Sequence, residues 1–409
     1  MAPVTLRSIA PSAFGPAILF GIGEGAVLPI VAISARDLGA SVGLAAFVVA
    51  LIGLGQIAGD LPAGALAARI GERAAMVVAA FAACLGLVVC VLAGSVGVLG
   101  VGILVVGVAG AVFGLARQSY LTEVVPLPLR ARALSTLGGS HRVGIFIGPL
   151  IGAWVTSWSG TDGAYAMFAI CAVAAGVLVL VVPDLTPPAD RHAGADAPRA
   201  TLAGVAKSHR QVLTTLGSCA LLLMAVRQAR QTLLPLWCQH LGLDVSTTSL
   251  LVGLSGAVDM LLFYPAGSVM DRRGRAWVGV PSLIVLGIGH ALLPLSHSIG
   301  AVAVVAVVLG IGNGMGAGLV MTLGADASPA HGRAAFLSVW RLVSDSGVAG
   351  GPLAVSVVAG MVGLGPASLV IAGLGGIAAA LLGRFAPRHP PHREHTESSA
   401  VAEGPSVRP

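Results

Sequence analysis

Twelve stretches of about 20 mostly apolar residues run through this 409-residue chain and constrain its fold more than any other feature. A helix needs about 20 apolar residues to cross the hydrocarbon core of a bilayer. These runs are continuous rather than alternating, which excludes a membrane β-barrel and predicts an all-α polytopic membrane protein. The predicted spans are 11–33, 43–66, 75–94, 97–119, 137–158, 163–183, 211–235, 246–269, 277–297, 299–321, 336–360 and 365–385.

Composition excludes the other broad classes of protein. Hydrophobic residues make up 56% of the chain and charged residues only 10%, against roughly 45–50% and about 25% in soluble domains. The net charge of +6 has no basic face behind it, so no nucleic-acid partner is expected. Five cysteines without a CxxC spacing predict neither a disulfide framework nor a metal site.

Arginine placement predicts the orientation in the membrane. Arginines gather in the loops after the even-numbered spans and in the tail, whereas the opposite loops hold only Arg36. Positive residues mark cytoplasmic loops, so both termini are expected in the cytoplasm. The single lysine, Lys207, together with abundant alanine, glycine, proline and arginine, is typical of a high-GC bacterial genome and suggests a bacterial plasma membrane.

Two halves of the chain repeat each other at a constant offset of 203 residues. LPAGALAARIG at 61–71 aligns with YPAGSVMDRRG at 264–274, and GIFIGP at 144–149 aligns with GVAGGP at 347–352. A third match pairs 122–135 with 325–338. This pattern predicts two parallel, pseudo-symmetric six-helix bundles related by an axis along the membrane normal. The predicted domains are an N-terminal bundle at 1–183, a cytoplasmic linker at 184–210, a C-terminal bundle at 211–385 and a disordered cytoplasmic tail at 386–409.

This arrangement resembles the major facilitator superfamily over residues 10–385, and three motifs carry the resemblance. GALAARIGER at 64–73 and GSVMDRRGR at 267–275 are similar to its motif A, although Ala68 stands where the first copy usually has aspartate. Arg117 matches the motif B arginine of drug–proton antiporters, and GIFIGPLIGA at 144–153 matches their motif C. The motif A residues are Gly64, Arg69, Gly71 and Arg73 in the first copy and Gly267, Asp271, Arg272, Gly274 and Arg275 in the second.

The resemblance implies a proton-coupled exporter that works by alternating access. Its substrate is a small molecule, its energy source is the proton gradient, and no cofactor is required. We expect a monomer in the lipid bilayer. No enzyme motif is present, so the chain is predicted not to be an enzyme. An importer or uniporter of a small polar solute and a transport-inactive membrane sensor are the alternatives.

The motifs also have physical interpretations. The motif A loops act either as conformational latches or only as positive-inside loops. Small residues at four-residue spacing permit close helix packing, either static or in a helix that rocks against its neighbour. The motif C residues are Gly144, Gly148, Pro149 and Gly152, with Gly347, Gly351 and Pro352 in the second half.

Charged residues inside the spans need a partner, water or a function, because a charge at the bilayer centre costs at least ~2.5 kcal/mol. Glu24 is the candidate proton or substrate carboxylate, or else one partner of a static ion pair with Arg117. Arg227 and Arg230 lie on one face of the seventh span and could bind an anionic or polar substrate group. His141, His290 and His297 are assigned structural or interfacial roles, with a proton relay as the alternative, and Asn313 is assigned to tight helix packing.

A second set of polar residues predicts a cytoplasmic gate, with permanent structural pairing or no contact at all as the alternatives. If the fifth span abuts the eighth and the second abuts the eleventh, Arg142 would meet Asp259 and Gln56 would meet Asp345. Asp60 and Arg341 would lie toward the cytoplasmic ends of their spans. The predicted gating residues are therefore Gln56, Asp60, Arg142, Asp259, Arg341 and Asp345.

Overall fold

The fold is described from a computed structural model over residues 14–125, 127–182, 204, 207–316, 318–329 and 333–386. Most of the predicted linker at 184–210 and nearly all of the predicted tail at 386–409 lie outside these residues. The division into domains at those boundaries therefore stays a prediction. The described part of the chain contains helices and turns but no strand, which confirms the all-α class.

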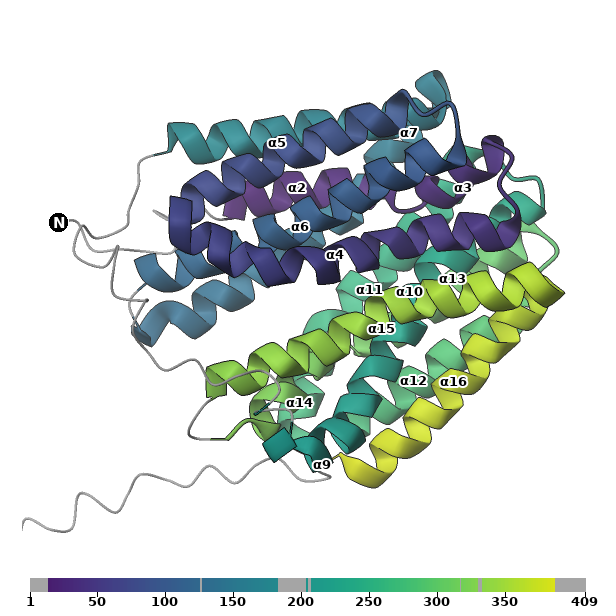
Figure 1. Ribbon diagram of the computed structural model, residues 1–409. Helices are drawn as coiled ribbons and strands as arrows, with labels where there is room; N and C mark the ends of the chain where they lie inside the picture. Colours follow the sequence, from purple (N-terminus) through teal and green to yellow (C-terminus); the bar gives the residue numbers. More distant parts are fainter. Residues whose placement is uncertain are drawn as a thin grey trace, which may run out of the picture.

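The helices form two groups that lie side by side (Figure 1). The first group comprises α2 (Gly15–Val27), α3 (Ile30–Asp37), α4 (Val42–Ile70), α5 (Glu72–Val91), α6 (Val96–Val124) and α7 (Leu127–Val181). The second comprises α9 (Arg210–Val212), α10 (Ser218–His240), α11 (Val245–Arg273), α12 (Ala276–Leu292), α13 (Ile299–Met315), α14 (Leu319–Ala327), α15 (Arg333–Val362) and α16 (Leu364–Phe385). A π-helical turn at Leu213–Gly217 precedes α10, and a 3-10 turn at Leu293–Leu295 follows α12.

Eleven helices of the described chain are long and apolar enough to cross a membrane. One of them, Thr136–Val181, contains 46 residues and would measure about 69 Å at 1.5 Å per residue, twice the core of a bilayer. Its backbone reverses at Gly160, which has φ 64° and ψ −160°. This helix therefore supplies two crossings, and the protein has the twelve predicted spans.

The backbone repeats the 203-residue offset at its turns. Six of the seven glycines with positive φ in the described chain form three pairs at this offset: Gly39 with Gly242, Gly71 with Gly274, and Gly160 with Gly363. Such φ values favour glycine because it has no Cβ. The N-caps of α4 and α11, Ser41 and Asp244, are also equivalent, and so are those of α6 and α13, Ser95 and Ser298. The two halves therefore share helix starts and turns as well as motifs.

Two predicted spans are divided in the structure, and several helices extend four or five residues past the predicted ends. The first divides into α2 and α3 at Pro29, because proline lacks the N–H that would continue the helix. The seventh runs on to His240. The tenth divides at Gly318, which adopts a left-handed conformation with φ 78°. Its repeat equivalent is Leu115, inside the continuous α6, so this break belongs to the second half alone.

Two helix pairs make most of the contact between the halves, α4 with α15 and α7 with α11, and α3 also contacts α10 and α11. α4 and α15 run side by side in Figure 1. A Cβ added at Gly43 or Gly53 would lie 2.8 Å from Gly360 or Ala349 respectively, so the two backbones nearly touch.

The same helices are open at their other ends. An added Cβ meets nothing within 4 Å at Gly64 of α4, Gly267 of α11, or Gly138 and Gly139 of α7. These positions lie toward the arginine-rich ends of the helices. The halves are therefore tightly packed where α4 and α11 begin, whereas these four glycines border open space.

Candidate functional site

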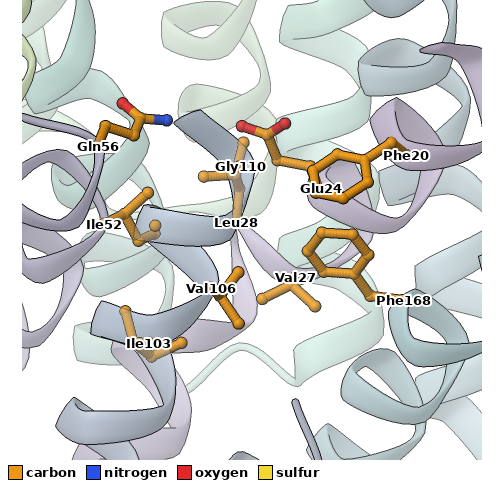
Figure 2. Close-up of a pocket in the computed structure, with 11 residues that line it drawn as sticks. Phe20, Glu24, Val27, Leu28, Ile52, Gln56, Ile103, Val106, Gly110 and Phe168 are labelled. Carbon is orange, nitrogen blue, oxygen red and sulfur yellow. The ribbon is translucent and has the colours of Figure 1, made fainter. Parts of the chain in front are cut away.

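Glu24 projects from α2 into a pocket between α2, α4 and α6. Figure 2 shows its carboxylate and the Gln56 amide at one end of the pocket, with Val27, Val106 and Ile103 at the other. The cavity volume is about 20 Å³, enough for a water molecule but not for an organic substrate. This arrangement gives Glu24 a small polar space inside an otherwise apolar bundle.

Glycines bring α2 close to its neighbours around Glu24. A Cβ added at Gly25 would lie 2.6 Å from the carbonyl oxygen of Ile145, and one added at Gly23 would overlap the ring of Phe168. Both contacts are with α7, whose two arms flank α2. The glycines of the GIGEGAV segment at 21–27 therefore allow α2 to pack closely against α7. Glu24 is the polar side chain of this segment.

Glu24 has two basic neighbours. His141 Nε2 lies 3.5 Å from Glu24 Oε2, and 25% of the Glu24 side chain remains accessible. Arg117 of α6 interacts electrostatically with both Glu24 and His141 and stacks over Phe113 at 5.7 Å. The sequence suggested Arg117 as the partner but assigned His141 a structural role. The signal that identifies His141 is its place in α7 opposite α2, which the sequence alone did not reveal.

In the second half, Arg227 belongs to a chain of polar side chains. Arg227 Nε donates a hydrogen bond of 2.8 Å to Asn313 Oδ1, and Asn313 Nδ2 donates one of 2.6 Å to Asp259 Oδ2. Arg227 Nη1 also donates to the carbonyl oxygen of Gly316 at 3.3 Å, near the break between α13 and α14. Asn313, which was assigned to helix packing, is thus the link between α10 and α11. A lone asparagine in an apolar span was the available signal.

Arg230 has separate partners from Arg227, although both lie on α10. Its Nη1 donates a hydrogen bond of 2.6 Å to Ser255 Oγ, and it interacts electrostatically with Asp259. Only 7% of the residue is exposed, and its Nε has no hydrogen-bond partner in the described chain.

The two polar centres occupy equivalent places in the repeat. Glu24 corresponds to Arg227, Gln56 to Asp259, and Gly110 to Asn313, each at the offset of 203. In the first half these positions line a small pocket. In the second half they form a hydrogen-bonded chain. Equivalent positions of the repeat therefore carry different charges, most clearly Glu24 in α2 and Arg227 in α10.

Four of the six predicted gating residues lie in pairs across the boundary. Arg142 of α7 interacts electrostatically with Asp259 of α11. Arg341 of α15 lies 3.8 Å from Asp60 of α4, from Nη2 to Oδ1, and 3.3 Å from Asp345, from Nε to Oδ2. The Arg341–Asp60 distance is that of an ion pair without a hydrogen bond.

The expected contact between Gln56 and Asp345 is replaced by another. Asp345 pairs with Arg341 on its own helix and lies beside Asp60. In the described chain Gln56 makes no hydrogen bond to it, because Gln56 faces the Glu24 pocket.

The motif A loops are one- and two-residue turns. Gly71 separates α4 from α5, and Gly274 begins the turn into α12. Arg73 donates hydrogen bonds to the carbonyl oxygens of Val179 and Val182 at the end of α7. Such bonds supply partners for carbonyls that a helix end leaves unpaired.

In the second loop Arg275 Nε lies 2.8 Å from Asp326 Oδ2 of α14, and its Nη1 donates to the carbonyl oxygen of Met270. Arg69 and Arg272 are exposed, and the side chain of Asp271 lies outside the described part of the structure. Arg73 and Arg275 therefore connect their loops to helices of the same half.

The motif C glycines pack against the first helix of their own half. Added Cβ atoms at Gly144 and Gly148 would overlap the carbonyl oxygens of Ile18 and Ile22 on α2, and those at Gly347 and Gly351 would overlap Leu221 and Ala225 on α10. All four contacts repeat at the same offset. Gly152 lies against Ala26, and Pro149 and Pro352 lie inside α7 and α15.

No group of three or more histidine, cysteine, aspartate or glutamate side chains that could hold a metal occurs among the described residues. The site is therefore built from charged and polar side chains of α2, α4, α6, α7, α10, α11, α13 and α15.

Known proteins share both the sequence pattern and the fold. The family model for the Major Facilitator Superfamily matches residues 14–352 and 216–408. A Bacillus subtilis (strain 168) protein described as the uncharacterized MFS-type transporter YddS is 26% identical over 363 residues, which cover 84% of this chain and 83% of that protein.

Two solved structures show the same fold at low sequence identity. A POT family transporter in complex with 5-aminolevulinic acid has a TM-score of 0.75 at 12% identity and covers 94% of this chain and 99% of its own. A D-xylose–proton symporter has a TM-score of 0.71 at 17% identity and covers 94% and 99%.

Proposed function

Because the chain belongs to the Major Facilitator Superfamily, and is thus a multi-pass membrane protein of a family of secondary transporters, we propose that it exports a small organic molecule in exchange for protons. We place it in a bacterial plasma membrane with both termini in the cytoplasm, as its arginine-rich loops suggest. The drug–proton antiporter motifs B and C favour export.

The observation that carries this proposal is the environment of Glu24. Its carboxylate lines a cavity of water size, lies 3.5 Å from His141 Nε2 and interacts with Arg117. A carboxylate that can reach water inside a membrane bundle is able to bind and release a proton. His141 is positioned to receive or return that proton, and Arg117 interacts electrostatically with both groups.

Alternating access would occur between the two bundles. The open positions at Gly64, Gly138, Gly139 and Gly267 are consistent with a site that opens toward the arginine-rich side. In the opposite state α4 and α15, and α7 and α11, would close at those ends and separate where they are now packed. The Asp60–Arg341 and Arg142–Asp259 pairs bridge the halves and would be remade in each cycle.

The proton gradient is the proposed energy source. Discharge of the gradient should therefore abolish net export, and neutralisation of Glu24 should do the same. A static ion pair of Glu24 would instead predict that its neutralisation lowers stability and leaves proton coupling intact.

The test measures accumulation of labelled or fluorescent small molecules in efflux-deficient cells that express the wild type, Glu24→Gln or the control Glu72→Gln, with and without a protonophore. Glu72 lies at the start of α5, where it accepts a hydrogen bond from Ser119. We expect cells that express the wild type or the control to accumulate less of the molecule than empty cells. This difference should disappear with Glu24→Gln or when the protonophore is added. Higher accumulation than in empty cells would instead indicate import, and gradient-independent transport would indicate a uniporter.

A further inference from the structure

Charged side chains on both sides of the boundary between the two halves interact electrostatically with one another. The interactions begin at Arg117, continue through Glu24 and the His141–Arg142 pair to Asp259, and end at Arg227 and Arg230. Hydrogen bonds join the last members, since Asn313 links Arg227 to Asp259. Residues of both halves therefore contribute to one electrostatic unit inside the membrane.

This unit has more positive than negative groups. Four guanidinium groups, Arg117, Arg142, Arg227 and Arg230, face two carboxylates, Glu24 and Asp259, which leaves two positive charges in excess while His141 is neutral. The other interior charges, Asp60, Arg341 and Asp345, interact with one another in a separate cluster. Uncompensated charge inside a bilayer is costly, and the described residues supply no further carboxylate to this unit, so the excess favours binding of an anion.

Two of these guanidinium groups also have hydrogen-bond donors without acceptors. Nε and Nη1 of Arg117 and Nε of Arg230 have no partner in the described chain, although these residues are only 8% and 7% exposed. Arg227, by contrast, donates to Asn313 and Gly316. Buried donors are nearly always satisfied, and guanidinium donors match the planar oxygens of a carboxylate.

We propose that the transported substrate is a small organic anion with carboxylate groups, and that Arg117 of the first half and Arg230 of the second supply its hydrogen bonds. Two separate donor groups and two excess charges favour a dicarboxylate over a monocarboxylate. Glu24 and Asp259 attract the neighbouring guanidinium groups and would repel an additional anion from their own positions. This inference rests on the proposed export function, because it names the substrate of the same central site.

The test measures ligand binding to the purified full-length protein. Binding is detected as a rise in the thermal unfolding midpoint at constant ionic strength. The probes are succinate, its monoamide, its neutral diamide and 1,4-diaminobutane, which share a four-carbon chain and differ in charge. The variants are Arg230→Gln, Arg230→Lys and Arg117→Gln. The control is Arg384→Gln, at the exposed end of α16, where the guanidinium lies over Phe385.

We expect succinate to stabilise the wild type and Arg384→Gln, the monoamide to do so less, and the diamide and the diamine not at all. Loss of a charge-assisted hydrogen bond should weaken succinate binding about 10- to 100-fold in Arg230→Gln and Arg117→Gln. Arg230→Lys keeps the charge but not the fork, so it should bind more weakly than wild type and also reports on the site if the glutamine variant does not fold.

Stabilisation by the diamine or diamide equal to that by succinate would overturn the inference, and so would wild-type affinity in both Arg230 variants or the absence of any succinate effect. Proteoliposomes with an imposed proton gradient separate this outcome from failure of the proposed function. Succinate binding without gradient-driven movement would contradict proton-coupled export alone. Gradient-driven movement of the diamine would contradict the anionic substrate alone.

Discussion

The hydroxyl group of Ser356 in α15 donates a hydrogen bond of 2.7 Å to the carbonyl oxygen of Gly43 in α4, across the boundary between the two halves. Ser246 in α11 makes the equivalent bond of 2.9 Å to the carbonyl oxygen of Ala153 in α7. Each donor is the repeat equivalent of the other bond's acceptor, since Ser246 corresponds to Gly43 and Ser356 to Ala153. The boundary is therefore closed by two symmetric hydroxyl–carbonyl bonds at the end where α4 and α11 begin.

The double variant Ser246→Ala, Ser356→Ala should favour the conformation in which this end is open. Each lost hydrogen bond contributes ~0.5–1.5 kcal/mol, so the equilibrium should shift by about 1–3 kcal/mol. Leu44 is exposed near the start of α4 and Met361 is exposed near the end of α15. Spin labels at these two positions, in a background without the native cysteines, should report a longer distance by pulsed electron resonance.

The matched control is Ser346→Ala, because that exposed hydroxyl bonds only to Leu342 of its own helix. It should leave the distance distribution unchanged. An unchanged distribution in the double variant as well would mean that backbone packing at Gly43 and Gly53, rather than the serines, holds this end closed.

Neighbouring glycines of α15 should respond oppositely to the same substitution. Gly351→Ala would place a methyl group against the carbonyl oxygen of Ala225, whereas an added Cβ at Gly350 meets nothing within 4 Å. Overpacking costs ~1–3 kcal/mol, so Gly351→Ala should lower the thermal unfolding midpoint of the purified protein. Gly350→Ala should leave it unchanged or raise it. A similar decrease in both would show that α10 and α15 do not need this close approach.

The fold could be predicted from the sequence because the hydropathy of a segment and an internal repeat both follow directly from the order of the residues. Twelve apolar runs set the number of spans, and Gly71 and Gly274 already marked equivalent turns. The break at Gly318 was missed because α6, its equivalent, has Leu115 there and continues. Hydropathy averaged over a span does not detect one left-handed residue.

The site was less predictable because its contacts depend on helix rotation and on side-chain reach. The offset of 203 paired Glu24 with Arg227, and the expected contact of the fifth span with the eighth placed Arg142 opposite Asp259. The offset gave no reason to prefer His141 over Arg117 beside Glu24, since both are polar residues of neighbouring spans. The expected contact of the second span with the eleventh paired Gln56 with Asp345, whereas Asp345 lies one helical turn from Arg341 and pairs with it. Asn313 has Gly110 as its equivalent, so the repeat concealed its role.

Exchange of the charges of Arg142 and Asp259 should restore part of the function that a single reversal removes. Asp259→Arg would place a third positive group beside Arg142 and Arg227 and would break the bond from Asn313, so transport should be abolished. The double variant Arg142→Asp, Asp259→Arg recovers the pair but not the asparagine bond, and should regain only a fraction of wild-type transport. Transport assays at matched membrane expression measure this, and complete absence of recovery would argue against a functional Arg142–Asp259 pair.

The N-cap of α11 should make stability depend on pH. Hydrogen bonds from the Thr247 side chain and backbone N–H hold the pKa of Asp244 below its ordinary value. A carboxyl group with a lowered folded-state pKa stabilises the protein fully above its unfolded pKa, about 3.9, and loses that contribution as the pH falls through its folded pKa. Replacement of an N-cap by alanine costs ~1 kcal/mol. Asp244→Ala should therefore lower the unfolding midpoint at pH 7 and have a smaller effect below pH 4.

Ser41→Ala removes the equivalent cap of α4, and because a hydroxyl group does not titrate in this range, its effect should be the same at both pH values. A pH-independent effect of Asp244→Ala would show that the carboxylate charge contributes nothing to this cap.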